Sequence, residues 1–163
     1  MTLSCLTNNI YDIAGIRVIC PFITDVYEVA RMLLSQTDVE LVQVKDYIRE
    51  PKENGYRSLH LIVKINVFFS DGMRQVPVEV QMRTIAMNFW ASTEHQLRYK
   101  KDKVITSEMH ARLKKCADIM ADADYQMQKL AEEIHFLGKI SIRKQYEDEC
   151  IQIETCRRNL FLI

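Results

Sequence analysis

The sequence predicts an α/β fold, because strand and helix patterns alternate along it and two strand patterns flank a tight turn. In Val76–His95, strict alternation of apolar and polar residues gives way at Ile85 to a spacing of three and four, which is typical of a strand that runs into a helix. A strand, a helix and a second strand are expected between residues 10 and 47. An Asp-Gly pair at 71–72 separates two further strand patterns and predicts that they pair antiparallel.

The composition predicts one domain without a membrane span. The 163 residues are 48% hydrophobic, which is enough for a single core. Lys plus Arg and Asp plus Glu both number 22, so any affinity for phosphate must be local, and neither DNA nor an anionic membrane is an expected partner. The five cysteines have no metal-ligand spacing, and no stretch approaches the ~20 apolar residues of a span. We expect a soluble, cytoplasmic protein with reduced thiols.

The first strand is expected over Ile10–Cys20, an apolar run that ends at Pro21. Asp12 and Arg17 interrupt this run, and a charge near a buried strand needs a partner. Gly15 suits either a bulge or the close approach of another group.

The next elements are a helix, a strand, a loop and another strand. Thr24 is the expected N-cap of the helix, and a strand follows at Val39–Tyr47. Pro, Gly and charged residues mark residues 48–55 as a loop. In the strand Tyr56–Ile65, alternation places three residues on the face opposite Leu59, Leu61 and Val63: Ser58, His60 and Ile62.

Polar side chains gather on one face of the predicted hairpin. Its second strand directs Val78, Val80 and Met82 to the core and three polar side chains to the other face: Glu79, Gln81 and Arg83. Antiparallel pairing brings Glu79 to the same side as His60. The preceding loop and the head of the first strand concentrate further phosphate donors around one aromatic ring, that of Tyr56, and together they indicate a phosphate-binding site: Lys52, Asn54, Tyr56 and Arg57. Taken singly, each is more readily explained as a surface or packing residue.

Two helical patterns fill the rest of the chain. The first carries an apolar stripe of Ile85, Phe89 and Leu97, and the basic run at 100–103 is expected to be solvated surface. A long helix is expected from Ser107 to Gly138. Its apolar residues follow a three-four spacing, which fits either a coiled-coil interface or packing on the domain's own sheet: Met109, Leu113, Cys116, Met120, Ala123, Met127, Leu130 and Ile134. Residues 139–163 are expected to form an extra strand or helix.

Four motifs carry a resemblance to a known family. They are Asp12-Ile-Ala-Gly-Ile-Arg17, Lys52-x-Asn54-Gly-Tyr56-Arg57-Ser58-x-His60, Glu79-Val-Gln81-Met-Arg83-Thr84 and Trp90-Ala-x-x-Glu94-His95. Together they resemble the synthetase domain of RelA/SpoT-type alarmone synthetases, most closely the small single-domain class, over roughly residues 10–136. The resemblance implies a nucleotidyltransferase-like mixed sheet flanked by helices. It implies a synthetase core over 1–100 and a helical segment with a tail over 101–163, within the same domain.

The resemblance also implies an activity. Such enzymes are GTP diphosphokinases of the stringent response, which transfer the diphosphate of ATP to the 3′-hydroxyl of GTP or GDP and form pppGpp or ppGpp. By resemblance, Asp12 holds Mg²⁺, and Glu79 shares the metal or accepts the proton of the 3′-hydroxyl. The long helix would assemble a homotetramer.

The remaining site residues take their expected roles from the same resemblance. Tyr56 resembles the residue whose ring stacks on guanine. Contacts to the acceptor nucleotide are implied for Lys52, Asn54, Arg57 and His60, with Gln81 and Arg83 as supports. Arg17 is either a ligand of the donor phosphates or a structural ion-pair partner of Asp12 or Glu79.

One departure from the family leaves alternatives open. Family members carry a basic segment that grips ATP before the strand of Asp12, whereas the first nine residues here contain neither Lys nor Arg. We expect either a fragment of a full-length synthetase or a short form that is impaired in transfer. A non-catalytic module that binds guanine nucleotides or oligomerises is the second hypothesis. A generic nucleotidyltransferase accounts for the two carboxylates but not for the cluster at 52–60.

Overall fold

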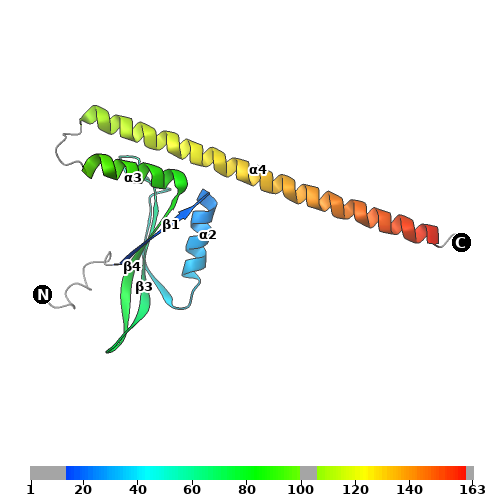
Figure 1. The fold of residues 1–163 in the computed structure, drawn as a ribbon, viewed down its shortest axis with the longest axis horizontal. Coiled ribbons are helices and arrows are strands. Elements are labelled where there is room, and N and C mark those ends of the chain that lie inside the picture. Colours follow the sequence, from blue (N-terminus) through cyan, green and yellow to red (C-terminus); the bar gives the residue numbers. More distant parts are fainter. Residues whose placement is uncertain (1–13, 100–105, 161–163) are drawn as a thin grey trace. The chain divides into compact units, whose positions relative to one another are not determined.

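The computed structural model describes residues 14–99 and 106–160. Its elements are β1 (Ala14–Cys20), α2 (Ile23–Leu34), β2 (Val39–Asp46), β3 (Leu59–Phe69), β4 (Gly72–Thr84), α3 (Ile85–Tyr99) and α4 (Ser107–Leu160) (Figure 1). The predicted α/β class is confirmed, and the switch from strand to helix falls at Ile85 as expected. The chain divides into two units, Met1–Tyr125 and Gln126–Ile163. The expected boundary near residue 100 stays a prediction.

The described strands form one mixed four-stranded sheet in the order β1-β4-β3-β2. β1 runs parallel to β4, whereas β4 pairs antiparallel with β3, and β3 with β2. The predicted hairpin is confirmed, since Phe69 pairs with Gly72 across its turn. Gly72 has a φ of +132°, a backbone conformation that residues other than glycine rarely adopt. The register sets Gly15 and Ile62 on either side of Glu79, so the neighbours of this carboxylate are fixed by the ladder.

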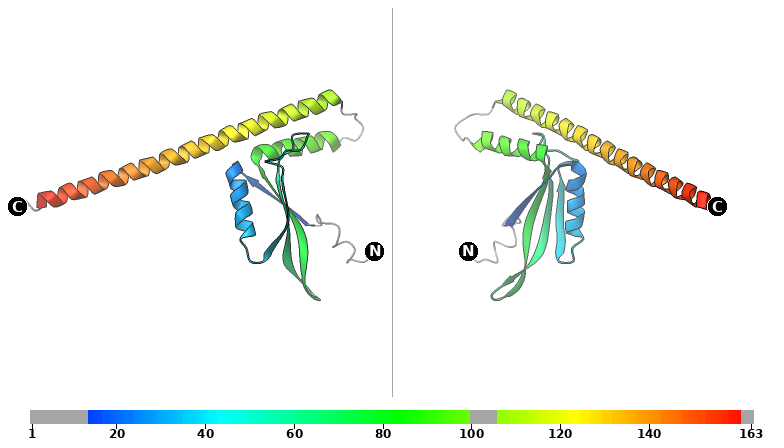
Figure 2. Two further views of the ribbon diagram at one scale, coloured as in Figure 1. Left: turned by 180° about the vertical axis from the view of Figure 1, so that it is seen from behind. Right: turned by 45° about the vertical axis from the view of Figure 1, so that its right-hand side comes forward.

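The apolar face of the sheet packs against α2, which lies along it in every view (Figures 1 and 2). The predicted core positions Val78, Val80 and Met82 are buried there with Val26 of the helix. The sequence led us to expect Thr24 as the N-cap of α2, but the N-cap is Phe22. The helix begins at Ile23, so Thr24 already lies inside its first turn. The polar face is therefore left for α3 and the loops.

The buried face of α3 differs from the predicted stripe. Ile85, Phe89 and Leu97 are 64%, 58% and 53% exposed. The packed residues are Met87, Trp90 and Ala91. The Trp90 indole Nε1 donates a hydrogen bond to the backbone oxygen of Leu113 at 3.0 Å, so the start of α4 selects which side of α3 is covered.

Helix α4 begins at Ser107 as predicted but does not end at Gly138, since it continues to Leu160. A glycine inside a helix costs only about 1 kcal/mol, so one glycine does not stop a long helical run. In the part of α4 that belongs to the first unit, the buried residues are Ala117 and Asp124, which lie outside the predicted three-four stripe. That stripe is largely exposed at Met109, Met127, Leu130 and Ile134.

Three further observations complete the comparison with the sequence. None of the helices in the described part of the chain combines the length and the hydropathy needed to cross a bilayer. Residues Ile10–Ile13 of the expected first strand, Asp12 among them, and the basic run at 100–103 lie outside the described residues. Gly15, expected to mark a bulge or a close approach, has room for a Cβ, whose nearest atom would be the backbone oxygen of Glu79 at 3.9 Å.

Candidate functional site

Five side chains at the polar face of β3 and β4 form a closed ring of hydrogen bonds. Arg83 Nη2 donates to Tyr56 Oη at 2.7 Å and to Gln81 Oε1 at 3.0 Å. Gln81 Nε2 in turn donates to Glu79 Oε2 at 2.8 Å. His60 closes the ring, with Nδ1 2.9 Å from Glu79 Oε1 and Nε2 2.8 Å from Tyr56 Oη. The predicted approach of His60 and Glu79 is thus confirmed, and their positions follow from the antiparallel register.

The direction of each bond in this ring follows from Arg83, which has only donors to offer. Because Tyr56 Oη accepts from the guanidinium, its own hydrogen is available for His60 Nε2. The imidazole then accepts at Nε2 and donates from Nδ1 to Glu79, which is the neutral form with one defined tautomer. Burial lowers the pKa of His60, and the charges of Arg83 and Lys52 add to this against the opposing effect of Glu79, so the net shift is downward. The ring therefore holds a neutral histidine.

Glu79 keeps its negative charge in this setting. Burial raises the pKa of its carboxyl, but the hydrogen bonds from Gln81 and His60 and the charge of Lys45 outweigh burial, and the pKa lies below its usual value. Each carboxylate oxygen accepts one hydrogen bond within the ring. A carboxylate offers about four lone-pair sites, so roughly two remain for a ligand. Glu79 is thus oriented by its neighbours without being saturated.

Arg83 is 5% exposed and has no carboxylate partner among the described residues. Its guanidinium is held by neutral acceptors, including Ser58 Oγ at 3.3 Å. The guanidinium carbon lies 5.2 Å from the centroid of the Tyr56 ring, and Lys52 Nζ lies 5.1 Å from the same centroid. Two cations therefore flank one aromatic ring, in the range of cation–π attraction.

The loop before β3 is shaped by its own backbone and by Asn54. Gly55 N–H donates to the oxygen of Lys52 at 2.8 Å, and Lys52 N–H donates to the oxygen of Tyr56 at 3.2 Å. Asn54 Oδ1 accepts from the N–H of Tyr56 at 3.1 Å. The turn requires a φ of +88° at Gly55, which explains the glycine. The loop thus presents Lys52 and Tyr56 from a defined turn.

Tyr56 lines an open cavity of about 460 Å³. Arg17 and Arg83 line it from the sheet, and α3 contributes five residues: Ala91, Ser92, Glu94, His95 and Gln96. Arg17 lies on β1 beside Gln81 in the parallel register and is exposed. The volume falls within the ~300–1,000 Å³ usual for small-molecule sites. One aromatic ring and two guanidinium groups at such a cavity suit a ligand that has a planar base and negative charge.

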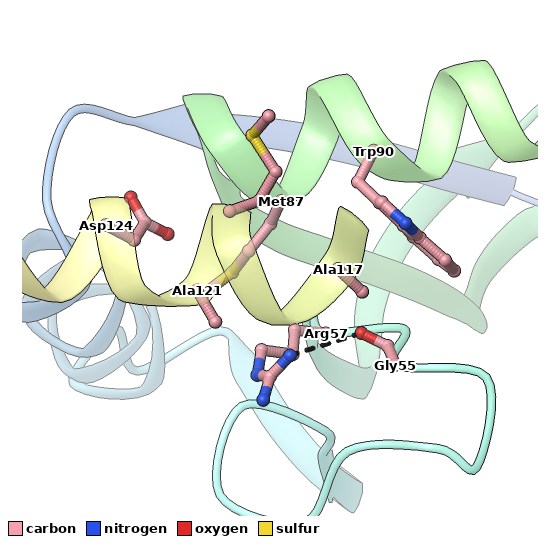
Figure 3. A pocket seen from close by; sticks show the side chains of 8 residues that line it. Gly55, Arg57, Met87, Trp90, Ala117, Ala121 and Asp124 are labelled. Carbon is pink, nitrogen blue, oxygen red and sulfur yellow. Dashed lines mark hydrogen bonds between the residues drawn. The ribbon is translucent and has the colours of Figure 1, made fainter. Parts of the chain in front are cut away.

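The structure brings together most of the predicted site residues, but Arg57 points elsewhere. Its Nη1 donates to the oxygen of Gly55 at 3.3 Å, and its side chain lines a cavity of about 10 Å³ together with Asp124 (Figure 3). Asp12 lies outside the described residues. Within the described ranges, no group of three or more His, Cys, Asp or Glu side chains is arranged to hold a metal ion.

Sequence reasoning missed two residues of this site, Lys45 and Tyr47, and gave Ser58 no role in it. Lys45 pairs with His60 in the ladder, and the Tyr47 ring centroid lies 5.4 Å from that of His60. Ser58 Oγ donates to the backbone oxygen of Met82 at 3.2 Å and accepts from Arg83. Ser58 was already placed on the correct face by alternation. For Lys45 and Tyr47 the only sequence signal was that they lie two residues apart in one strand pattern. Their register with β3 is set by contacts between residues distant in sequence.

Comparisons with known proteins agree with this geometry. Residues 3–104 match the protein family described as the region found in RelA / SpoT proteins. The chain is 43% identical to the GTP pyrophosphokinase YwaC of Bacillus subtilis (strain 168) over 129 residues, which are 79% of this chain and 61% of that protein. It is 41% identical to the GTP pyrophosphokinase YjbM of the same strain over 138 residues, or 85% and 65% of the two lengths. The chain thus spans less than two thirds of each relative.

Solved structures give the same result. The small alarmone synthetase 1 from Bacillus subtilis, bound to its product pppGpp, superposes with a TM-score of 0.75 at 38% identity and covers 83% of this chain and 68% of that one. The same synthetase bound to AMPCPP gives a TM-score of 0.67 at 31% identity, with coverages of 83% and 67%. The small alarmone synthetase 2 of that organism gives 0.74 at 40% identity, with coverages of 82% and 77%.

Proposed function

This chain belongs to the RelA/SpoT family, and from that premise we propose that it is a GTP diphosphokinase, which transfers the diphosphate of ATP to the 3′-hydroxyl of GTP or GDP. The observation that carries the proposal is the hydrogen-bonded ring. It links an aromatic ring at an open cavity, Tyr56, to an ionised carboxylate, Glu79, through one histidine. A guanine stacked on the side chain of Tyr56 would bring its ribose toward the carboxylate of Glu79.

The acceptor nucleotide is assigned to the side of the site that the loop and β3 build. Tyr56 provides the stacking surface, and base–aromatic stacking is worth about 1–3 kcal/mol per base. Lys52 supplies a positive charge over this ring, while Asn54 fixes the turn that carries both residues. His60 orients Glu79 and Tyr56, and Gln81 and Arg83 support them from β4.

The donor phosphates are assigned to the opposite side of the cavity. Arg17 lines it from β1, with a guanidinium that can bind phosphate oxygens bidentately. The structure of the B. subtilis synthetase bound to AMPCPP and that bound to pppGpp support a site for two nucleotides in the family. In a diphosphate transfer, the role of such cations is to offset charge that builds up between two polyanions.

Mg²⁺ fits the donor set at Glu79. This ion is commonly held by one or two carboxylates together with substrate phosphates, and Glu79 has lone pairs left outside the ring. Asp12 is the second proposed ligand. When bound, Mg²⁺ would neutralise phosphate charge during the transfer. For its part, Glu79 either shares the ion or accepts the proton of the 3′-hydroxyl, for which its ionised state is suited.

The second hypothesis is a module that binds a guanine nucleotide without transferring diphosphate. It is supported by the contrast between the ordered hydrogen bonds around Tyr56 and the exposed Arg17. To test both, the protein is incubated with ATP, GTP and Mg²⁺, and the products are separated by anion exchange, with a parallel reaction in the presence of a chelator. Formation of pppGpp supports the enzyme. GTP binding by calorimetry without any product supports the module, and absence of both rejects the assignment.

The family resemblance further suggests a homotetramer formed through α4. The exposed apolar residues Met127, Leu130 and Ile134 are suited to such an interface. Light scattering should give a mass severalfold above the 19.2 kDa of the chain. The double variant Met127→Glu/Ile134→Glu should lower that mass, whereas Lys129→Glu, which reverses a charge about opposite on the helix, should not. A wild type that scatters as a monomer at micromolar concentration would refute this assignment.

A further inference from the structure

The loop that carries Lys52 and Tyr56 packs directly against α4. A Cβ added to Gly55 would lie 2.4 Å from the Cβ of Ala117, a distance that real Cβ atoms do not reach. Gly55 also has a φ of +88°. The absence of a side chain at this position therefore allows a close approach of helix and loop, and the shape of the loop depends on where the helix surface lies.

A buried carboxylate of α4 reaches the other end of the site. Asp124 is 7% exposed and accepts a hydrogen bond from the hydroxyl of Thr84, the last residue of β4. The same hydroxyl oxygen accepts the N–H of Met87 at 3.1 Å and so caps the first turn of α3. Asp124 is thus held where β4 passes into α3, one residue after Arg83 of the hydrogen-bonded ring.

Arg57 lies between these two contacts. Its guanidinium donates to the backbone oxygen of Gly55, and it lines the same cavity of about 10 Å³ as Asp124 (Figure 3). This volume is close to that of one water and far below that of a nucleotide base. Burial raises the pKa of Asp124, while the Thr84 hydroxyl and the charge of Arg57 lower it, with a net upward shift. Opposite charges that line one cavity of this size attract each other, although the two side chains are not an ion pair in direct contact.

We propose that Arg57 and Asp124 are positioning residues that hold the loop 52–56 against α4, so that the packing of this helix determines how Lys52 and Tyr56 face the guanine nucleotide. This inference rests on the proposed function for its last step only. The holding of the loop is a property of the protein without nucleotide. Arg57, expected from the sequence to contact nucleotide, then acts through the backbone of Gly55.

The first test measures the loop without any nucleotide. Asp124→Asn keeps an acceptor for Thr84 and removes the charge that attracts Arg57. Amide hydrogen exchange at Gly55 and Tyr56, whose N–H groups are bonded within the loop, should become at least about tenfold faster, which corresponds to ~1.4 kcal/mol in the free energy of local opening. The melting temperature should stay within a few degrees, since a buried carboxylate is replaced by a neutral amide.

The matched control is Asp118→Asn. Asp118 lies on the same helix but is exposed and pairs with Lys114, so its loss should leave exchange in the loop unchanged. Arg57→Gln should reproduce the effect of Asp124→Asn. The double variant should be no worse than the more affected single variant, because both residues act on one interaction. Unchanged exchange at Gly55 and Tyr56 in Asp124→Asn would overturn the proposal whatever the nucleotide data show.

The second test uses GTP as the probe. Both single variants should raise the Kd for GTP several-fold and leave the Kd for a non-hydrolysable ATP analogue unchanged. Weakening by Arg57→Gln alone, with Asp124→Asn equal to wild type, would mean that Arg57 contacts the nucleotide and would overturn the positioning role. If wild type binds no GTP, the proposed function fails, while the exchange measurement still decides whether the loop is held.

A steric pair provides a test that involves no charge. Gly55→Ala should clash with Ala117 and speed exchange in the loop, and adding Ala117→Gly should restore part of the protection because it removes the opposing Cβ. The rescue is expected to be incomplete, since an alanine at φ +88° remains strained. No rescue at all would contradict control of the loop by the helix surface.

Discussion

The β3–β4 side of the cavity and its β1 edge are built in opposite ways. On the first side, Tyr56, His60 and Glu79 belong to one closed ring in which each polar group is bound by a neighbour. At the edge, Arg17 is exposed and has no partner among the residues that the structure describes. A preorganised group loses little freedom when a ligand binds, whereas a free arginine must be ordered at that moment. We therefore expect the β3–β4 side to bind GTP on its own. Binding of ATP at the β1 edge should also depend on groups other than Arg17.

The strongest test of this comparison is Glu79→Gln. The amide keeps the shape of the carboxylate and removes its charge, so diphosphate transfer should fall by at least the ~100-fold typical of a lost general base. GTP affinity should change little, because Tyr56 and the loop remain. The control is Glu40→Gln, which removes an exposed carboxylate of β2 that pairs with Lys64. If the wild type makes product and Glu79→Gln makes it at the same rate, Glu79 is structural.

Two substitutions of Tyr56 separate its ring from its hydroxyl. Tyr56→Ala should weaken GTP binding by about 1–3 kcal/mol, the range for base–aromatic stacking, as measured by calorimetry. Tyr56→Phe keeps the stacking surface but removes the partner of Arg83 and His60. It should mainly lower the free energy of unfolding, by about 1–3 kcal/mol for buried polar groups left unsatisfied. If both variants bind GTP with the affinity of the wild type, Tyr56 is a packing residue and does not stack on guanine.

The neutral histidine of the ring predicts a dependence of stability on pH. Because the pKa of His60 lies below its ordinary value of about 6.5, the unfolded chain binds a proton at a pH at which the folded protein does not. This contribution to stability is fully present above about pH 6.5 and is lost as the pH falls from there toward the lowered folded pKa. Chemical denaturation at pH 7.5 and 5.5 should show a smaller loss in His60→Gln than in wild type. His110→Gln, an exposed histidine of α4, should behave like wild type.

The smallest effect is expected at the β1 edge. Arg17→Ala should change the free energy of unfolding by less than about 0.5 kcal/mol, as is usual for exposed side chains without partners. It should nevertheless weaken binding of a non-hydrolysable ATP analogue and leave GTP binding intact. A marked loss of stability in Arg17→Ala would indicate a structural ion pair, for instance with Asp12, and the two sides of the cavity would then be more alike than proposed.

The parts of the fold that were predicted correctly depend on short-range patterns. The alternation around Glu79 and the Asp-Gly turn together placed His60 beside it, because a hairpin transmits register over a few residues. Lys45 was missed, since its pairing with His60 depends on a connection of twelve residues whose path is set by packing. The exposure of Phe89 and the direction of Arg57 depend on α4, whose position no local pattern encodes. The end of α4 was misplaced because one glycine is a weak signal.

The position of Trp90 has an optical consequence. It is the only tryptophan of the chain, and it is buried where α3 meets α4, in a cluster against which Tyr56 packs. Its indole N–H is bonded to the backbone of α4. Selective excitation of this single fluorophore therefore samples the surroundings of the loop and of the helix start, with no label attached. A change in emission during a GTP titration would then come from one known position in the fold.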